Sequence, residues 1–127
     1  MSSAPKPRPK YYDINLAHLP PPGLLSIFHR VSGSVLFFAI PVLLYLLQAS
    51  FNSEAEYNQL KAFFGHPLVK FATIGAVWLY AHHFFAGLRY LLLDLHVGLE
   101  KADARRSALV VFFLGALAAA FYGGCTW

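Results

Sequence analysis

The feature that most constrains this chain is a series of three apolar stretches, each close to the length of a membrane-spanning helix. No Asp, Glu, Lys or Arg occurs in residues 31–47, 71–88 or 107–127. A helix that crosses a bilayer needs about 20 apolar residues. With their flanking residues included, the three stretches predict an all-α integral membrane protein with three transmembrane helices, at roughly 24–49, 67–93 and 106–125.

The composition agrees with a membrane protein and excludes several other classes. Only 13% of the residues are charged and 57% are hydrophobic, whereas soluble domains average about 25% and 45–50%. The single cysteine, Cys125, excludes a disulfide framework, a Cys-rich zinc site and an iron–sulfur cluster held by this chain. Because the sequence also has no nucleotide-binding loop, nucleophile elbow or HExxH motif, we expect no catalytic residue of its own.

Prolines and charges divide and orient the chain. Pro20-Pro21-Pro22-Gly23 is expected to precede the first helix, and Pro41 is expected to kink it mildly. The predicted division is a Pro-rich segment, 1–23, followed by a transmembrane anchor domain, 24–127. Basic residues gather in the N-terminal segment and in the second polar loop: Lys6, Arg8, Lys10, Lys101, Arg105 and Arg106. The positive-inside rule then places the N-terminus in the cytoplasm and the C-terminus outside.

Other interpretations of these basic residues are weaker. They lie at the ends of apolar stretches, which favours topology over a phosphate-binding face, so no nucleic-acid partner is expected. The first 50 residues loosely match a signal peptide. However, their apolar stretch is long and interrupted by proline.

Several polar groups lie where lipid is expected. The first helix carries Ser26, His29 and Arg30 in its first turns, and the second contains His82, His83 and Arg89. Ionisable groups at membrane depth usually face a cavity, a cofactor or another helix. The two arginines could instead extend to the headgroups.

His82 and His83 lie near the middle of the bilayer and are candidate ligands for haem iron. Adjacent helix positions point about 100° apart, so both rings cannot bind one iron. Gly87 is four residues after His83, on the same face, where a missing side chain leaves room for a flat macrocycle. Tyr90 continues that face, so the spacing favours His83.

The depth of the other polar groups suggests a second chain. His29 lies about 8 Å from the start of the first helix, whereas His83 lies about 15 Å from the same side of the membrane. One haem plane does not suit both, so a second axial ligand should come from another chain. His29, Arg30, Arg89 and Tyr90 share a shallower level, which suits carboxylate groups such as haem propionates.

These residues resemble a known family. Arg8-Pro9, the segment Ser26-Ile-Phe-His-Arg-Val-Ser-Gly33, the segment His83-Phe-Phe-Ala-Gly-Leu-Arg-Tyr90 and Asp94 closely resemble the cytochrome b membrane-anchor subunit of bacterial succinate dehydrogenase. The resemblance covers nearly the whole chain, including the number and order of helices. Three positions depart from the family pattern: Lys10, Tyr90 in place of a histidine, and His96.

The resemblance implies roles for particular residues. His83 would be an axial ligand of haem b, and a companion anchor subunit would supply the other ligand. Ser26 and Arg30 would contribute to the ubiquinone site. His29 and Arg89 would lie near the haem propionates.

The resemblance to this family also implies partners and a location. An iron–sulfur subunit and a flavoprotein subunit would dock on the cytoplasmic face of the bacterial inner membrane. Electrons would pass from succinate to ubiquinone, linking the tricarboxylic acid cycle to the respiratory chain. Three alternatives remain open: the anchor of a menaquinone-linked fumarate reductase, a haem-free structural anchor, and a transporter component.

Overall fold

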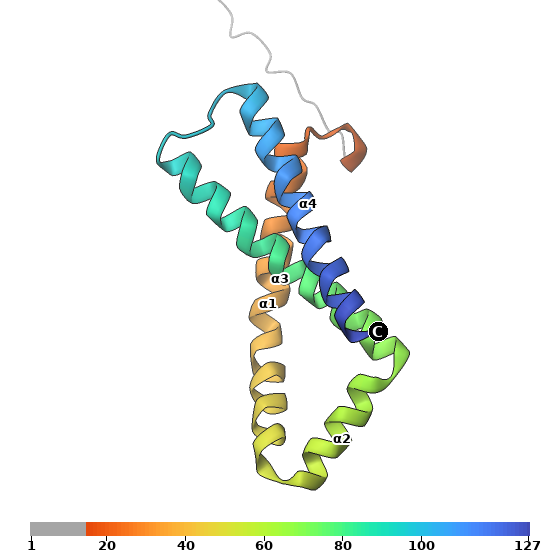
Figure 1. Ribbon diagram of the computed structural model, residues 1–127. Coiled ribbons are helices and arrows are strands. Elements are labelled where there is room, and N and C mark those ends of the chain that lie inside the picture. The colour runs from red at the N-terminus through yellow and green to blue at the C-terminus, as the bar shows by residue number, and fades with distance from the viewer. Residues whose placement is uncertain (1–14) are drawn as a thin grey trace, which may run out of the picture.

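The structure, a computed structural model, describes residues 15–127, and every regular element in that range is helical. A 3-10 turn, η1 (Leu16–His18), precedes α1 (Pro21–Asn52), α2 (Glu54–Gly65), α3 (Pro67–Asp94) and α4 (Lys101–Thr126). Helices α1, α3 and α4 are long and apolar enough to cross a membrane (Figure 1). The predicted all-α membrane fold is therefore confirmed. The basic residues Lys6, Arg8 and Lys10 lie outside the described range.

Two helices begin earlier than expected. Helix α1 begins at Pro21, within the proline run that was expected to precede it. Proline fits the first turn because those N–H groups have no partner inside the helix and because its fixed φ is already helical. Pro41 lies inside α1 and does not end it. Helix α4 begins at Lys101 rather than near residue 106, since its charged first turns can extend beyond the apolar stretch as a helix.

Helix α2 was not predicted and occupies most of the expected first loop. Its N-terminus is capped by Ser53, whose Oγ accepts a hydrogen bond from the Glu56 backbone N–H at 3.2 Å. The Asn52 side-chain amide donates to the Glu56 carboxylate at 2.6 Å. A serine followed three residues later by a glutamate is a known helix-start pattern. The chain therefore turns at Ser53 and immediately resumes a helix.

Helices α3 and α4 form the closest pair and lie side by side in Figure 1. Their contact is made by small residues, of which Ala108, Gly115 and Ala119 are buried. A Cβ atom added at Gly115 would lie 3.5 Å from the His82 backbone nitrogen. Small side chains allow transmembrane helices to approach closely, and lipid-embedded helices associate through such contacts.

Helix α1 is covered only in part. Near its start, the fully buried Leu25 packs into a small core with Ala86, Ala108 and Val111. Farther along, α1 leads away from α3, and α2 returns to α3 across the opening (Figure 1). The side chains of Phe37 and Phe38 are 66% and 73% exposed. The later half of α1 therefore presents apolar groups to lipid or to another chain.

The two ends of the α3–α4 pair are fixed by specific bonds. Two residues after the end of α3, His96 has a φ of 63°. Its N–H is bonded to the Leu93 carbonyl at 2.9 Å, and the Val97 N–H is bonded to the Leu92 carbonyl at 3.0 Å. These two bonds form a Schellman motif, which needs a left-handed residue at that position. At the opposite end, Lys70 Nζ donates to the Thr126 carbonyl at 2.9 Å.

Candidate functional site

The site is centred on His83, at the crossing of α1 and α3. Its ring Nδ1 lies 3.0 Å from Ser32 Oγ and 3.1 Å from the backbone carbonyl oxygen of His29. The imidazole of His29 stacks on that of His83, with ring centroids 4.4 Å apart and planes 13° from parallel. Two helices far apart in the sequence therefore fix one ring, with α3 supplying the imidazole and α1 supplying its contacts.

An open cavity of about 550 Å³ lies beside this ring. It is lined by His29, Arg30, Gly33, Ser34, Phe37, Phe38 and His83. A Cβ atom added at Gly33 would lie only 2.9 Å from His83 Cε1. Glycine is therefore required for α1 to pass the His83 ring at this distance, and it keeps the ring in the cavity wall.

His82 has a different environment, although it is the adjacent residue. Its side chain is fully buried among Phe28, Trp78 and Phe112, and its ring stacks on Trp78 at a centroid distance of 5.3 Å. Within residues 15–127, neither of its ring nitrogens has a hydrogen-bond partner. His82 therefore belongs to an aromatic cluster between α1, α3 and α4, and the cavity beside His83 does not include it.

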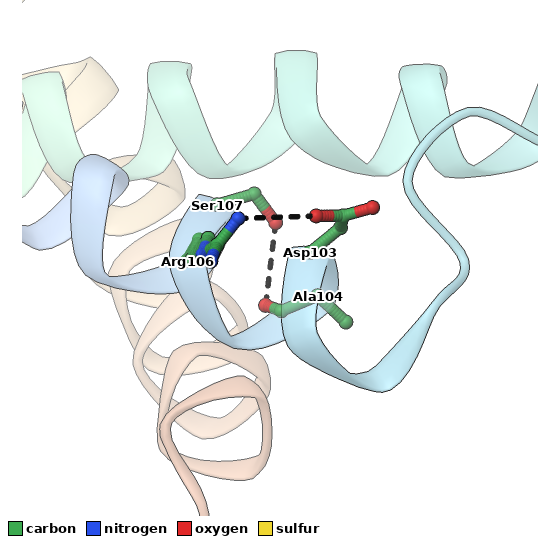
Figure 2. Close-up of polar contacts among 4 residues, drawn as sticks. All are labelled: Asp103, Ala104, Arg106 and Ser107. Carbon is green, nitrogen blue, oxygen red and sulfur yellow. Dashed lines mark hydrogen bonds and ion pairs between the residues drawn. The ribbon is translucent and has the colours of Figure 1, made fainter.

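Arg89 points toward α4 rather than toward the cavity. Its side chain is 6% exposed, and it donates from Nε to Ser107 Oγ at 2.9 Å and from Nη2 to the Ala104 carbonyl at 3.1 Å. Figure 2 shows that Ser107 also donates to the Ala104 carbonyl, beside an ion pair between Arg106 and Asp103. Arg89 therefore bridges α3 to the first turns of α4.

The remaining candidate residues fall into two groups. The Tyr90 ring lies 5.1 Å from the His29 ring, and its buried hydroxyl has no hydrogen-bond partner within residues 15–127. The Arg30 side chain is exposed and lines the cavity. Ser26 is partly buried on the same helix, one turn earlier, and is not among the residues that line the cavity.

The donor set of the site is compatible with haem. His29 provides a carbonyl oxygen, which accepts hydrogen bonds, so the close Nδ1 of His83 must carry the proton. Nε2 then keeps its lone pair, and a lone pair on a ring nitrogen is what binding to iron requires. The His29 imidazole stacks on the same ring, with planes 13° from parallel, so it does not face the His83 Nε2. The residues described therefore fit one iron ligand, His83.

Two contributors to this geometry were missed by the sequence reasoning. Ser32 and Gly33 lie in the segment that carried the family resemblance, but neither was assigned a role. The available signal was position: Ser32 and Gly33 lie three and four residues after His29, so they continue the face that meets α3. Their contact with His83 depends on how the helices cross, which sequence spacing does not give.

Comparisons with known proteins identify the family of the chain. Residues 4–122 match the family described as succinate dehydrogenase/fumarate reductase transmembrane subunit. The succinate dehydrogenase cytochrome b556 subunit of Coxiella burnetii (strain RSA 493 / Nine Mile phase I) is 34% identical over 121 residues, covering 94% of this chain and 97% of the relative. The protein of the same name from Paracoccus denitrificans is 28% identical over 101 residues, covering 80% and 78%.

Proposed function

The chain belongs to the succinate dehydrogenase/fumarate reductase transmembrane subunit family, as a cytochrome b membrane anchor, and on that premise we propose that it supplies one axial ligand of haem b and part of a ubiquinone site. The observation that supports this most strongly is the state of His83. One ring nitrogen is held by Ser32 and the His29 carbonyl, while the ring lines a cavity of about 550 Å³. His83 is thus oriented as a ligand, whereas His82 is enclosed.

Haem b, when bound, supplies a one-electron redox centre within the membrane. The residues of this chain would orient and hold it. His83 Nε2 would bind the iron, and the stacked His29 would restrict rotation of the His83 ring. A companion anchor subunit would provide the second axial ligand, because His29, the other histidine in the cavity wall, stacks on the His83 ring and does not face it from across the cavity.

The haem carboxylates would be held near the cytoplasmic end of the site. The Tyr90 hydroxyl has no partner within residues 15–127 and lies beside His29, so both side chains are candidate hydrogen-bond donors to a propionate. Arg89 uses Nε and Nη2 on α4, so its contribution to a propionate rests on Nη1. Its positive charge stays close to Tyr90, 5.5 Å from the ring centroid.

Arg30 and Ser26 would contribute to the ubiquinone site. A quinone carbonyl accepts hydrogen bonds and gains negative charge during reduction, which a guanidinium and a hydroxyl stabilise. Arg30 lines the cavity beside His83 and has no ion-pair partner within the described residues. Its proposed role is to bind and orient a quinone carbonyl within reach of electrons from the succinate-oxidising partners.

The soluble partners would dock where α1 and α4 begin. Lys101 and Arg105 line a pocket of about 420 Å³ with the proline run that starts α1. This concentration of positive charge supports a cytoplasmic position for that end and for segment 1–23, with the anchor domain, 24–127, in the bacterial inner membrane and the C-terminus in the periplasm. The flavoprotein and iron–sulfur subunits would then meet the membrane near Arg30.

A reduced-minus-oxidised absorption spectrum tests the haem assignment. The complex is expressed with its companion subunits, as wild type, His83→Ala and the control His82→Phe, which keeps the aromatic cluster filled. We expect a b-type band in the wild type and in His82→Phe, and its loss in His83→Ala. A band that survives His83→Ala would overturn the ligand assignment. An assembled, succinate-oxidising wild type without the band would identify a haem-free anchor.

A further inference from the structure

Ser32 occupies an unusual position for a serine in a transmembrane helix. Its side chain is 2% exposed, and its Oγ contacts two groups at once. It donates to the His29 carbonyl, three residues earlier, at 2.9 Å, and it lies 3.0 Å from His83 Nδ1 on another helix. A serine in a helix often donates a hydrogen bond to a preceding carbonyl, but this tendency does not explain the contact with His83.

The count of protons fixes the direction of the second bond. Ser32 has one hydroxyl proton, which the His29 carbonyl receives. Toward His83, the Ser32 oxygen therefore acts as an acceptor, and Nδ1 must donate. The His29 carbonyl, 3.1 Å from the same nitrogen, can also only accept. Two acceptors thus converge on one N–H and select the tautomer in which Nε2 carries the lone pair.

We propose that Ser32 is a positioning residue, which holds the His83 imidazole in its ligand tautomer and orientation and so sets how firmly haem is retained and how readily its iron is reduced. This inference rests on the proposed function. Metal-bound histidines commonly donate their second N–H to an acceptor, which fixes the ring and makes the ligand a stronger electron donor. Here a buried hydroxyl on α1 provides that acceptor for a ligand on α3.

Ser50 provides a matched comparison on the same helix. Its hydroxyl also donates to the carbonyl three residues earlier, that of Leu47 at 2.7 Å, but it does not line the cavity beside His83. Ser50→Ala therefore removes a helix back-bond away from the ligand. Ser32→Ala removes a similar back-bond together with one of the two acceptors for Nδ1. The difference between the two variants isolates the contact with His83.

The experiment uses the complete complex, purified as wild type, Ser32→Ala, Ser32→Thr and Ser50→Ala. Haem loss to excess apomyoglobin measures retention, and a spectroscopic redox titration and the g-values of the ferric haem report on the ligand. We expect about a 10-fold faster loss of haem in Ser32→Ala, in line with other outer-sphere substitutions. We also expect a higher reduction potential, because a weaker donor stabilises ferric iron less. Ser32→Thr should restore the wild-type potential, and Ser50→Ala should match the wild type.

Two failures are distinguishable. A wild-type complex that assembles and oxidises succinate without haem would overturn the proposed function. A wild type with haem, and a Ser32→Ala complex with the same potential, g-values and rate of haem loss, would overturn only the role of Ser32. If Ser32→Ala does not assemble, Ser32→Thr provides the test. This variant keeps the hydroxyl, so a haem reduction potential different from the wild-type value would also contradict the inference.

Discussion

Replacing Gly33 by alanine is the sharpest steric test of the site. The added Cβ would lie 2.9 Å from His83 Cε1, whereas ordinary contacts begin at 3.4 Å, so the ring must move by at least about 0.5 Å. The ring is not free to move. Its Nδ1 is held at 3.0 Å by Ser32 and at 3.1 Å by the His29 carbonyl, and one face is stacked on the His29 ring.

The cost of Gly33→Ala follows from those restraints. A shift of that size either lengthens the hydrogen bonds toward about 3.5 Å, where they are largely lost, or compresses the stacked rings. Overpacking of this kind costs about 1–3 kcal/mol, and alanine recovers about 0.5–1 kcal/mol of helix stability relative to glycine. The middle of each range leaves a net cost of about 1.3 kcal/mol, which corresponds to a loss in haem affinity on the order of 10-fold.

The assay measures haem per purified complex and the rate at which haem passes to apomyoglobin. Gly75→Ala is the control, because a Cβ added there meets nothing within 4 Å. We expect Gly75→Ala to match the wild type and Gly33→Ala to lose haem about 10-fold faster. Wild-type haem content and kinetics in Gly33→Ala would show that the close approach of α1 to His83 does not constrain the ligand.

Three further substitutions address other contacts. Arg89→Ala should lower the thermal midpoint of the complex, since charge-assisted bonds such as those to Ser107 and to the neighbouring α4 carbonyl contribute about 1.5–3 kcal/mol; an unchanged midpoint would refute the bridging role. Lys70→Met should cost about 1 kcal/mol and speed amide hydrogen exchange in the last turn of α4, because the bond that ties that turn to α3 is lost; equal exchange rates would contradict this. Arg30→Ala should reduce quinone reductase activity at least about 10-fold and leave the haem band intact; parallel loss of both would assign Arg30 to folding.

The membrane-spanning elements could be predicted from the sequence because their signal is local. Apolar length alone identified the cores of α1, α3 and α4. The ends were less accurate, since Pro21 satisfies a first turn and Lys101 extends α4 beyond the apolar stretch. Helix α2 was missed because its main signal in the sequence is a short capping pattern, Ser53 followed by Glu56.

The sequence was enough to name candidate residues of the site, but not to say which residues contact one another. Depth and helical spacing favoured His83 as the candidate ligand, but the structure differs on both points. The His29 ring stacks on the His83 ring at 4.4 Å instead of lying at a shallower level, because α1 and α3 cross there. The space expected at Gly87 is taken by His29, whose Nε2 would lie 3.8 Å from a Cβ atom added at that glycine.

The partners of the His83 ring are Ser32 and the His29 carbonyl, which come from a helix more than 50 residues away, at distances in sequence of 51 and 54. The bond from Arg89 to Ser107 likewise depends on the α3–α4 contact, which small residues such as Gly115 permit without indicating which polar groups will meet.

The uncovered side of α1 would have a consequence for the synthesis of the proposed complex. A copy without the proposed companion anchor would leave the cavity beside His83 and Arg30 facing hydrocarbon, with imidazole and guanidinium groups in its wall. Exposing such groups to lipid costs several kcal/mol. Surplus copies would therefore be less stable in the membrane, and synthesis of the two proposed anchors in equal numbers would avoid that cost. The opening proposed to admit a cofactor would then also favour assembly in equal numbers.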